Sequence, residues 1–140
     1  MTINVRKGSQ DDQAAVIALW RACDLVSGAN DPNAEFKLAL GKESSDVLVA
    51  VDEKGQVVGS VMVGHDGHRG WLYYVASAPS VRAQGIGRHV VKVAEEWLKE
   101  RGIFKAQLLV TETNQAVVPF YEQLGFERSP RIVMRKRLYD

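Results

Sequence analysis

The stretch Val81-Arg82-Ala83-Gln84-Gly85-Ile86-Gly87-Arg88 decides the fold, because it joins a strand pattern to a helix pattern through two closely spaced glycines. The preceding run, 71–77, is aromatic and β-branched, has the length of a strand, and is followed by Pro79. In residues 86–101 the apolar side chains recur at the spacing of one helix face. The sequence therefore predicts a strand, a turn and a helix in succession.

The two glycines give this turn the chemistry of an anion-binding site. Gly85 and Gly87 let a ligand approach the backbone, and the first N–H groups of a helix have no partner inside the helix. Together with the helix dipole and the charges of Arg82 and Arg88, these groups favour a phosphate or pyrophosphate. Taken alone, Gly-x-Gly is equally well interpreted as a tight turn without a ligand. The common nucleotide-binding patterns do not fit, because position 90 is valine and no Gly-Lys-Ser/Thr is present.

Length and composition predict one globular domain covering residues 1–140. Hydrophobic residues make up 46% and charged residues 25% of the chain, and no apolar run approaches the roughly 20 residues of a membrane span. A net charge of +1 provides no general attraction to nucleic acid or to an anionic membrane, so neither is expected as a partner. The single Cys23 and the absence of a signal-peptide pattern predict a cytoplasmic protein.

Hydrophobic periodicity and turn residues predict the element order β α α β β β α β α β β. The predicted strands cover about 3–7, 47–51, 56–64, 71–77, 105–111, 126–128 and 132–138, and the predicted helices about 9–24, 33–42, 86–101 and 115–124. The long helix between 71–77 and 105–111 requires these two strands to be parallel. The expected fold class is α/β (α+β), with a mixed, mostly antiparallel sheet of six to seven strands, one central parallel pair and four helices.

Individual residues mark particular points of these elements. Gly59 is predicted to form a bulge or a close approach within its strand. Asn114 is predicted to cap the N-terminus of the last helix, and Gly102 and Gly125 to end the two helices that precede them.

A second motif occupies residues 114–126, Asn-Gln-Ala-Val-Val-Pro-Phe-Tyr-Glu-Gln-Leu-Gly-Phe. It resembles the Asn…Ala…Phe-Tyr-x-x-x-Gly-Phe segment of the GNAT N-acetyltransferase family, and Arg-x-x-Gly-x-Gly at 82–87 resembles the acyl-CoA pyrophosphate loop of that family. The two motifs and the element order together cover essentially the whole chain. Residues 20–25, 30–32 and 67–70 make the sequence similar to the small bacterial YpeA-type members.

The resemblance implies transfer of an acetyl group from acetyl-CoA, the cosubstrate, to a primary amine by direct attack in a ternary complex. It implies that CoA is bound by Val75, Ala76, Ser77, Arg82, Ala83, Gln84, Gly85, Ile86, Gly87, Arg88, Asn114 and Tyr121. It also implies that Tyr121 protonates the departing thiolate and that a backbone N–H near Val75 stabilises the oxyanion. Asn114 and Tyr121 are seven residues apart and would share one face of the predicted helix. A core aromatic side chain is the alternative role for Tyr121.

No general base is assigned. Protein N-terminal acetyltransferases of the family carry a glutamate five residues before the motif asparagine, and this chain has Leu109 there. Glu112 is expected to be solvated. Tyr73 and Tyr74 are candidates for a water relay, one of them only packing, and proton loss to solvent without a dedicated base is an alternative.

The candidate acceptor-binding residues are Tyr73, His68, Arg69 and Asp31. Residues 65–69 precede the strand 71–77, at the end opposite the pyrophosphate, where an acceptor would enter; a solvated hairpin turn is the alternative. No metal is expected, because a tight turn rarely converges three side chains on one ion. The amine acceptor remains open between a small molecule and a peptide or protein, and the chain is expected to be a monomer or homodimer. A non-catalytic acyl-CoA sensor or interaction module is the alternative function.

Overall fold

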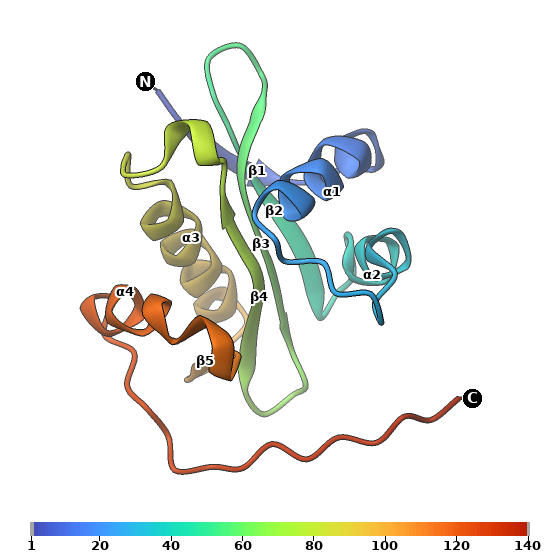
Figure 1. Ribbon diagram of the computed structural model, residues 1–140, viewed down its shortest axis with the longest axis vertical. Coiled ribbons are helices and arrows are strands. Elements are labelled where there is room, and N and C mark those ends of the chain that lie inside the picture. The colour runs from blue at the N-terminus through green and yellow to red at the C-terminus, as the bar shows by residue number, and fades with distance from the viewer. Residues whose placement is uncertain (1, 140) are drawn as a thin grey trace. The chain divides into compact units, whose positions relative to one another are not determined.

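The computed structural model describes residues 2–139 and comprises two compact units, Met1–Leu109 and Val110–Asp140. The first unit contains one sheet with the strand order β1-β2-β3-β4-β5 (Figure 1). Its strands are β1 (Asn4–Lys7), β2 (Ser45–Val51), β3 (Val57–His65), β4 (Gly70–Ser77) and β5 (Ala106–Leu108). Its helical elements are η1 (Gln10–Asp12), α1 (Gln13–Ala22), α2 (Pro32–Ala39), η2 (Pro79–Val81) and α3 (Ile86–Glu100). All neighbouring strands are antiparallel except the pair β4 and β5, which confirms the predicted mixed sheet with one parallel pair.

Helices cover both faces of this sheet, with α3 on one face and α1 and α2 on the other (Figure 1). The core under α1 and α2 includes Val16, Trp20 and Phe36, which are fully buried. On the opposite face the predicted apolar stripe of α3 is buried, as Val90 and Ala94 illustrate. Because β2 lies between the two layers, its side chains from 46 to 51 are all buried, as its continuous apolar sequence predicts.

Gly59 fulfils both predicted roles. The register between β2 and β3 shifts beside it, and a Cβ at this position would collide with Ile86 Cγ2 and lie 3.1 Å from the carbonyl oxygen of Ala76. The missing side chain therefore lets the first residue of α3 pack directly against the sheet.

The second unit contains η3 (Glu112–Val117) and α4 (Val118–Gln123). The predicted N-cap is wrong: Thr111 precedes the first helical turn, and Asn114 lies within η3 at φ −122° and ψ 33°. Pro119 has no N–H to donate to the carbonyl four residues earlier, so regular α-helix starts only at Val118. The two-turn spacing of Asn114 and Tyr121 is consequently not that of one continuous α-helix. Gly125, at φ 94°, ends α4 as predicted.

The sheet has five strands among residues 2–139, not six to seven. The strands predicted at 126–128 and 132–138 are absent from the described chain, because Pro130 lacks a backbone donor and residues 131–137 contain four basic side chains. The strand β5 is shorter than the predicted 105–111, since it pairs only with the first three residues of β4.

Two further sequence expectations concern the chain as a whole. Within residues 2–139, every helix is too short or too polar to cross a bilayer. The interpretation of residues 1–140 as a single domain stays a prediction.

Candidate active site

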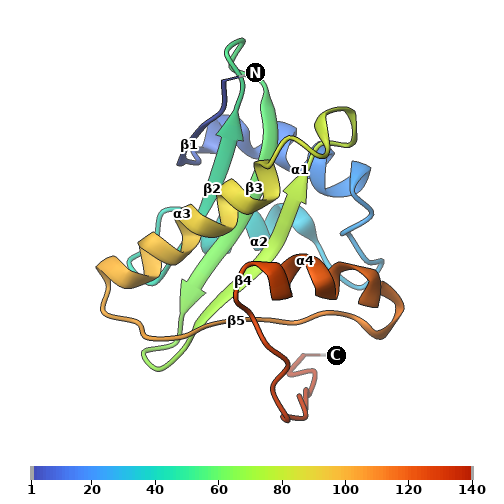
Figure 2. The same ribbon diagram turned by 90° about the vertical axis from the view of Figure 1, so that its left-hand side faces the viewer.

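The connection between β4 and α3 is built from exposed, left-handed backbone (Figure 2). After η2 the chain passes through Ala83 at φ 70° and Gly85 at φ 78°, and Gly85 directly precedes α3. Residues 82–85 are exposed, and a Cβ at Gly85 would meet no atom within 4 Å. An approaching ligand therefore finds open space where the unpaired N–H groups of the α3 N-terminus begin.

The side chain of Arg82 is tethered to the end of β4. Its Nε donates to the carbonyl oxygen of Ser77 at 3.3 Å, and Cys23 Sγ donates to the same oxygen at 3.3 Å. The carbonyl of Ser77, one of the predicted CoA-binding residues, thus already has two donors. Ala76, another of them, is hydrogen-bonded to Ser60 of β3.

A β-bulge interrupts β4 in front of this loop. Ser60 pairs with Ala76 and Met62 with Tyr73, so that Tyr74 and Val75 together stand opposite one residue of β3. Tyr74 adopts φ 52°, a left-handed conformation that is unusual for a non-glycine residue. A bulge disrupts the regular ladder and leaves a residue unpaired, which is the backbone state that an oxyanion donor at Val75 requires.

Side chains from three elements hold the bulge in place. Trp20 Nε1 donates to Ser60 Oγ at 2.9 Å, and Ser60 Oγ donates to the Tyr74 carbonyl at 3.0 Å. The Tyr74 ring stacks on Trp20 with a centroid distance of 3.8 Å and an interplanar angle of 8°. Its hydroxyl donates to Glu35 Oε2 at 3.0 Å, and burial, followed by the Glu35 carboxylate, raises the pKa of Tyr74 to about 12. Tyr74 is therefore the packing member of the tyrosine pair.

Beyond the bulge, one edge of β4 has no strand beside it in the described part of the chain. The parallel strand β5 pairs only with Gly70–Leu72, and residues 73–77 continue past it. This edge presents backbone N–H and C=O groups in strand geometry, which an extended ligand can pair with in the manner of an added strand.

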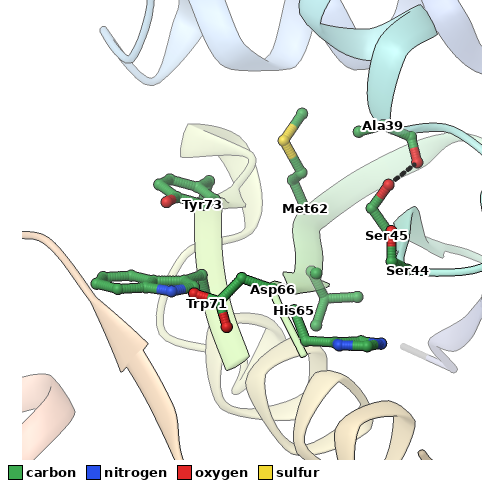
Figure 3. A pocket seen from close by; sticks show the side chains of 10 residues that line it. Ala39, Ser44, Ser45, Met62, His65, Asp66, Trp71 and Tyr73 are labelled. Atoms are coloured by element: carbon green, nitrogen blue, oxygen red, sulfur yellow. Dashed lines mark hydrogen bonds between the residues drawn. The ribbon is translucent and has the colours of Figure 1, made fainter. Parts of the chain in front are cut away.

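A pocket of about 240 Å³ lies at the other end of β4, on the face covered by α2 (Figure 3). Trp71 and Tyr73, two residues apart on one face of β4, form one wall with ring centroids 6.3 Å apart and an interplanar angle of 18°. Met62 of β3 and Ala39 of α2 also line it, and Asp66 lies at its edge, in the turn between β3 and β4.

Only one of the four predicted acceptor-binding residues, Tyr73, lines this pocket. Asp31 lies outside this pocket and caps α2, because its Oδ1 accepts from Asn33 N at 3.0 Å and from Ala34 N at 3.3 Å. The backbone N–H groups of His68 and Arg69 donate to Asp66, which shapes the turn.

Trp71 was missed as a pocket residue, although its alternation with Tyr73 along the strand places both side chains on one face. Glu35 was missed because nothing in the sequence brings it to β4. In residues 2–139 no group of three potential metal-ligating side chains converges.

The predicted acid, Tyr121, lies in α4 of the second unit. Its ring packs edge-to-face on Phe120 at 4.9 Å and on Phe126 at 5.8 Å between centroids. Burial raises the pKa of Tyr121 above its usual value, so its phenol stays protonated across the neutral range. Asn114 of the same unit is exposed.

Comparison with known proteins supports this geometry. Residues 14–126 match the model of the acetyltransferase (GNAT) family. An acetyltransferase of Pectobacterium atrosepticum is 39% identical over 138 residues, which cover 99% of this chain and 97% of that protein. An aminoglycoside N-acetyltransferase in complex with CoA has a TM-score of 0.82 at 15% identity, over 99% of this chain and 96% of the other. An acetyltransferase of Clostridium acetobutylicum solved with acetyl-CoA has a TM-score of 0.78 at 17% identity, with 96% of both chains covered. Because the family model matches residues 14–126 and a relative is 39% identical over 97% of its own length, this chain belongs to the GNAT family of acetyltransferases.

Proposed function

We propose that this chain transfers an acetyl group from acetyl-CoA to a primary amine by direct attack in a ternary complex. The observation that carries the proposal is the connection from β4 to α3, in which left-handed residues expose the N-terminus of a helix flanked by Arg82 and Arg88. Such a terminus favours a pyrophosphate. Two structures of the same fold are described as holding CoA or acetyl-CoA, which supports the same donor here.

The donor is proposed to lie along the bulged end of β4. The pyrophosphate contacts the backbone of residues 82–88, and pantetheine pairs with backbone groups of residues 75–77 along the edge that β5 does not occupy. Asn114 and Tyr121 are proposed to complete this site, a role that rests on the resemblance of residues 114–126 to the family motif.

The chemistry then requires three events. The neutral amine nitrogen attacks the thioester carbon, and the oxyanion that forms accepts a hydrogen bond from the N–H of Val75. The carbon–sulfur bond breaks, the amide remains on the acceptor, and the thiolate of CoA takes a proton from the Tyr121 phenol. With ordinary pKa values near 10 and 8.5, this transfer is uphill by about 2 kcal/mol, and the raised pKa of Tyr121 adds to that cost. A hydrogen bond to the tyrosinate that forms would lower the cost, and solvent then returns the proton to Tyr121.

The proton lost by the attacking amine is proposed to pass to solvent. The strand β4 contains no carboxylate. Glu35 accepts the hydroxyl of Tyr74, whose raised pKa opposes its ionisation. Tyr73 lines the pocket and is 43% exposed, so it is the tyrosine that can order a water beside the amine.

We further propose that the chain is one of the YpeA-type members, a single domain that acts as a monomer or homodimer in the cytoplasm. An amine acceptor would enter at the start of β4, where the pocket is lined by Tyr73.

Thiol release from acetyl-CoA, measured across pooled amino acids, polyamines, aminoglycosides and peptides, tests this function. We expect release with one pool and a fall in kcat for Tyr121→Phe at unchanged affinity for acetyl-CoA. Phe120→Leu, which alters a neighbouring ring of the same helix, is the matched control for packing. Binding of acetyl-CoA without release from any pool would contradict turnover and favour the acyl-CoA sensor.

A further inference from the structure

We propose that the pocket at the start of β4 binds the second, distal ammonium group of a short aliphatic diamine, whose other amino group is acetylated. This inference rests on the proposed function and deepens it by naming the acceptor class. It follows from the walls, the charge and the size of the pocket.

The walls suit an alkyl ammonium chain. Trp71 and Tyr73 present two nearly parallel aromatic rings along one side of the pocket, and Met62 and Ala39 supply apolar surface (Figure 3). Aromatic faces attract cations electrostatically, and tryptophan does so most strongly. An aliphatic spacer between two amines would pack on the same apolar surface.

The charge of the lining also selects a cation. Asp66 is the only carboxylate among the side chains that line the pocket, and neither lysine nor arginine is among them. Asp66 accepts from His68 N at 2.9 Å and from Arg69 N at 2.7 Å, and these bonds, with Arg69 first, hold the pKa of its carboxyl below the usual value. Both bonds use Oδ1, the Trp71 side chain also lowers the pKa of this carboxyl, and Asp66 is exposed, so its carboxylate is accessible to a ligand.

Two polar side chains of the wall already have partners within the protein. Ser45 Oγ donates to the Ala39 carbonyl at 2.9 Å, and His65 Nδ1 accepts from Gly67 N at 3.0 Å.

The size argues for a short chain. A volume of about 240 Å³ lies below the roughly 300–1,000 Å³ of pockets that enclose drug-sized ligands. An aminoglycoside, such as the sisomicin in one structure of this fold, carries several rings and amines. One carboxylate and one aromatic wall match a single distal ammonium instead.

Steady-state acetylation of 1,4-diaminobutane, 1-aminobutane and 4-amino-1-butanol tests the inference, because the three share a reacting amine and differ at the distal group. We expect kcat/KM for the diamine to exceed that of either analogue at least about tenfold, from the aromatic and carboxylate contacts. In Asp66→Asn and in Trp71→Leu this preference should shrink severalfold, while KM for acetyl-CoA stays unchanged.

Asp52→Asn is the matched control, because Asp52 Oδ1 also accepts two backbone N–H groups, from Lys54 and Gln56 at 2.9 Å, in the turn of another hairpin. This variant should retain the full preference for the diamine. Equal kcat/KM for the diamine and the monoamine, or a higher value for an aminoglycoside, would overturn the inference while leaving acetyl transfer established. Failure of the proposed function would show itself differently, as no thiol release with any amine. Trp71→Leu also alters packing, so a second readout is needed. Calorimetry can compare the affinity of wild type and of Asp66→Asn for 1,4-diaminobutane. Equal affinities of these two proteins would also overturn the inference.

Discussion

The candidate sites at the two ends of β4 differ in the part of the chain that forms them, backbone at one end and side chains at the other. At its carboxyl end the site consists of backbone: the bulge at Tyr74 and Val75, two left-handed residues after Ser77, and the start of α3, which follows β4 in Figure 2. At its amino end the site consists of side chains that four separate elements bring together around Trp71 and Tyr73. Backbone recognition suits a pyrophosphate, which needs only N–H groups and positive charge, whereas side chains can distinguish one amine from another.

This difference predicts which substitutions affect which substrate. Changes around Gly85 should weaken acetyl-CoA binding without changing the choice of acceptor, and changes around Asp66 should do the reverse. The following variants test that separation, beginning with the largest expected effect.

Gly85→Asp should weaken acetyl-CoA binding about 100-fold, because a carboxylate would stand beside the pyrophosphate. In Gly85→Asn the new side chain is nearly the same size as aspartate but carries no charge, and asparagine also tolerates the left-handed conformation. This variant should therefore weaken acetyl-CoA binding less than about fivefold. Calorimetric titration of both variants separates charge from backbone strain. Equal affinities for the two variants would contradict an anion at this turn.

Gly59→Ala should destabilise the fold by about 2 to 3 kcal/mol, because the new methyl group collides with Ile86 and overpacks the junction of α3 with the sheet. Acetyl-CoA affinity should fall with it, since Ile86 is the first residue of α3. Gly28→Ala, where a Cβ meets no atom within 4 Å, is the control and should change stability by less than about 0.5 kcal/mol. Urea unfolding gives both values; equal stability of the two variants would refute the close approach.

Ser60→Ala should cost about 1 to 2 kcal/mol, because it leaves the buried Trp20 N–H and the Tyr74 carbonyl without their hydrogen-bond partner. If this network holds the bulge, kcat should fall more than affinity for acetyl-CoA. Ser60→Cys, which restores a weak donor and acceptor, should recover part of kcat. A loss of stability with unchanged kcat would mean that the bulge does not depend on Ser60.

Arg6→Met is remote from both ends of β4 and should have the smallest effect, below about 1 kcal/mol at neutral pH. Arg6 donates to both Asp12 oxygens, at 2.8 and 3.0 Å, and this pairing chiefly holds the pKa of Asp12 below its usual value. A lowered folded-state pKa contributes stability above the unfolded-state pKa of about 3.9, and this contribution is lost as the pH falls through the folded-state value. The urea midpoints at pH 7 and pH 3 should therefore differ less in Arg6→Met than in wild type, and the substrate affinities should not change. An equal difference in the two proteins would show that the ion pair does not cause the loss of stability in acid.

More of the site at the carboxyl end of β4, which consists of backbone, could be predicted from the sequence than of the site at its amino end, which consists of side chains. The strand, turn and helix could be predicted because the glycines, Pro79 and the apolar stripe of α3 each indicate the backbone conformation of adjacent residues in the sequence. The bulge at Tyr74 could not, since nothing in a Tyr-Tyr pair signals a left-handed residue. It depends on Trp20 and Glu35, which are 54 and 39 residues away in the sequence and meet Tyr74 only through packing.

The same contrast holds for the acceptor residues. Asp31 caps α2, a local role that its position before Pro32 indicates, and its part in acceptor binding stays a prediction. Trp71 was overlooked because a pocket lined by Ala39, Met62 and Trp71 depends on the register between strands and on a helix from another part of the chain.

Amide chemical shifts of the labelled protein test the separation of the two ends most directly. We predict that acetyl-CoA shifts the resonances of residues 75–77 and 82–88 and leaves those of Asp66 and Trp71 in place. 1,4-Diaminobutane, added with CoA already bound, should shift Asp66 and Trp71 and leave residues 82–88 unchanged. Saturating acetyl-CoA that leaves residues 82–88 unshifted would contradict the account.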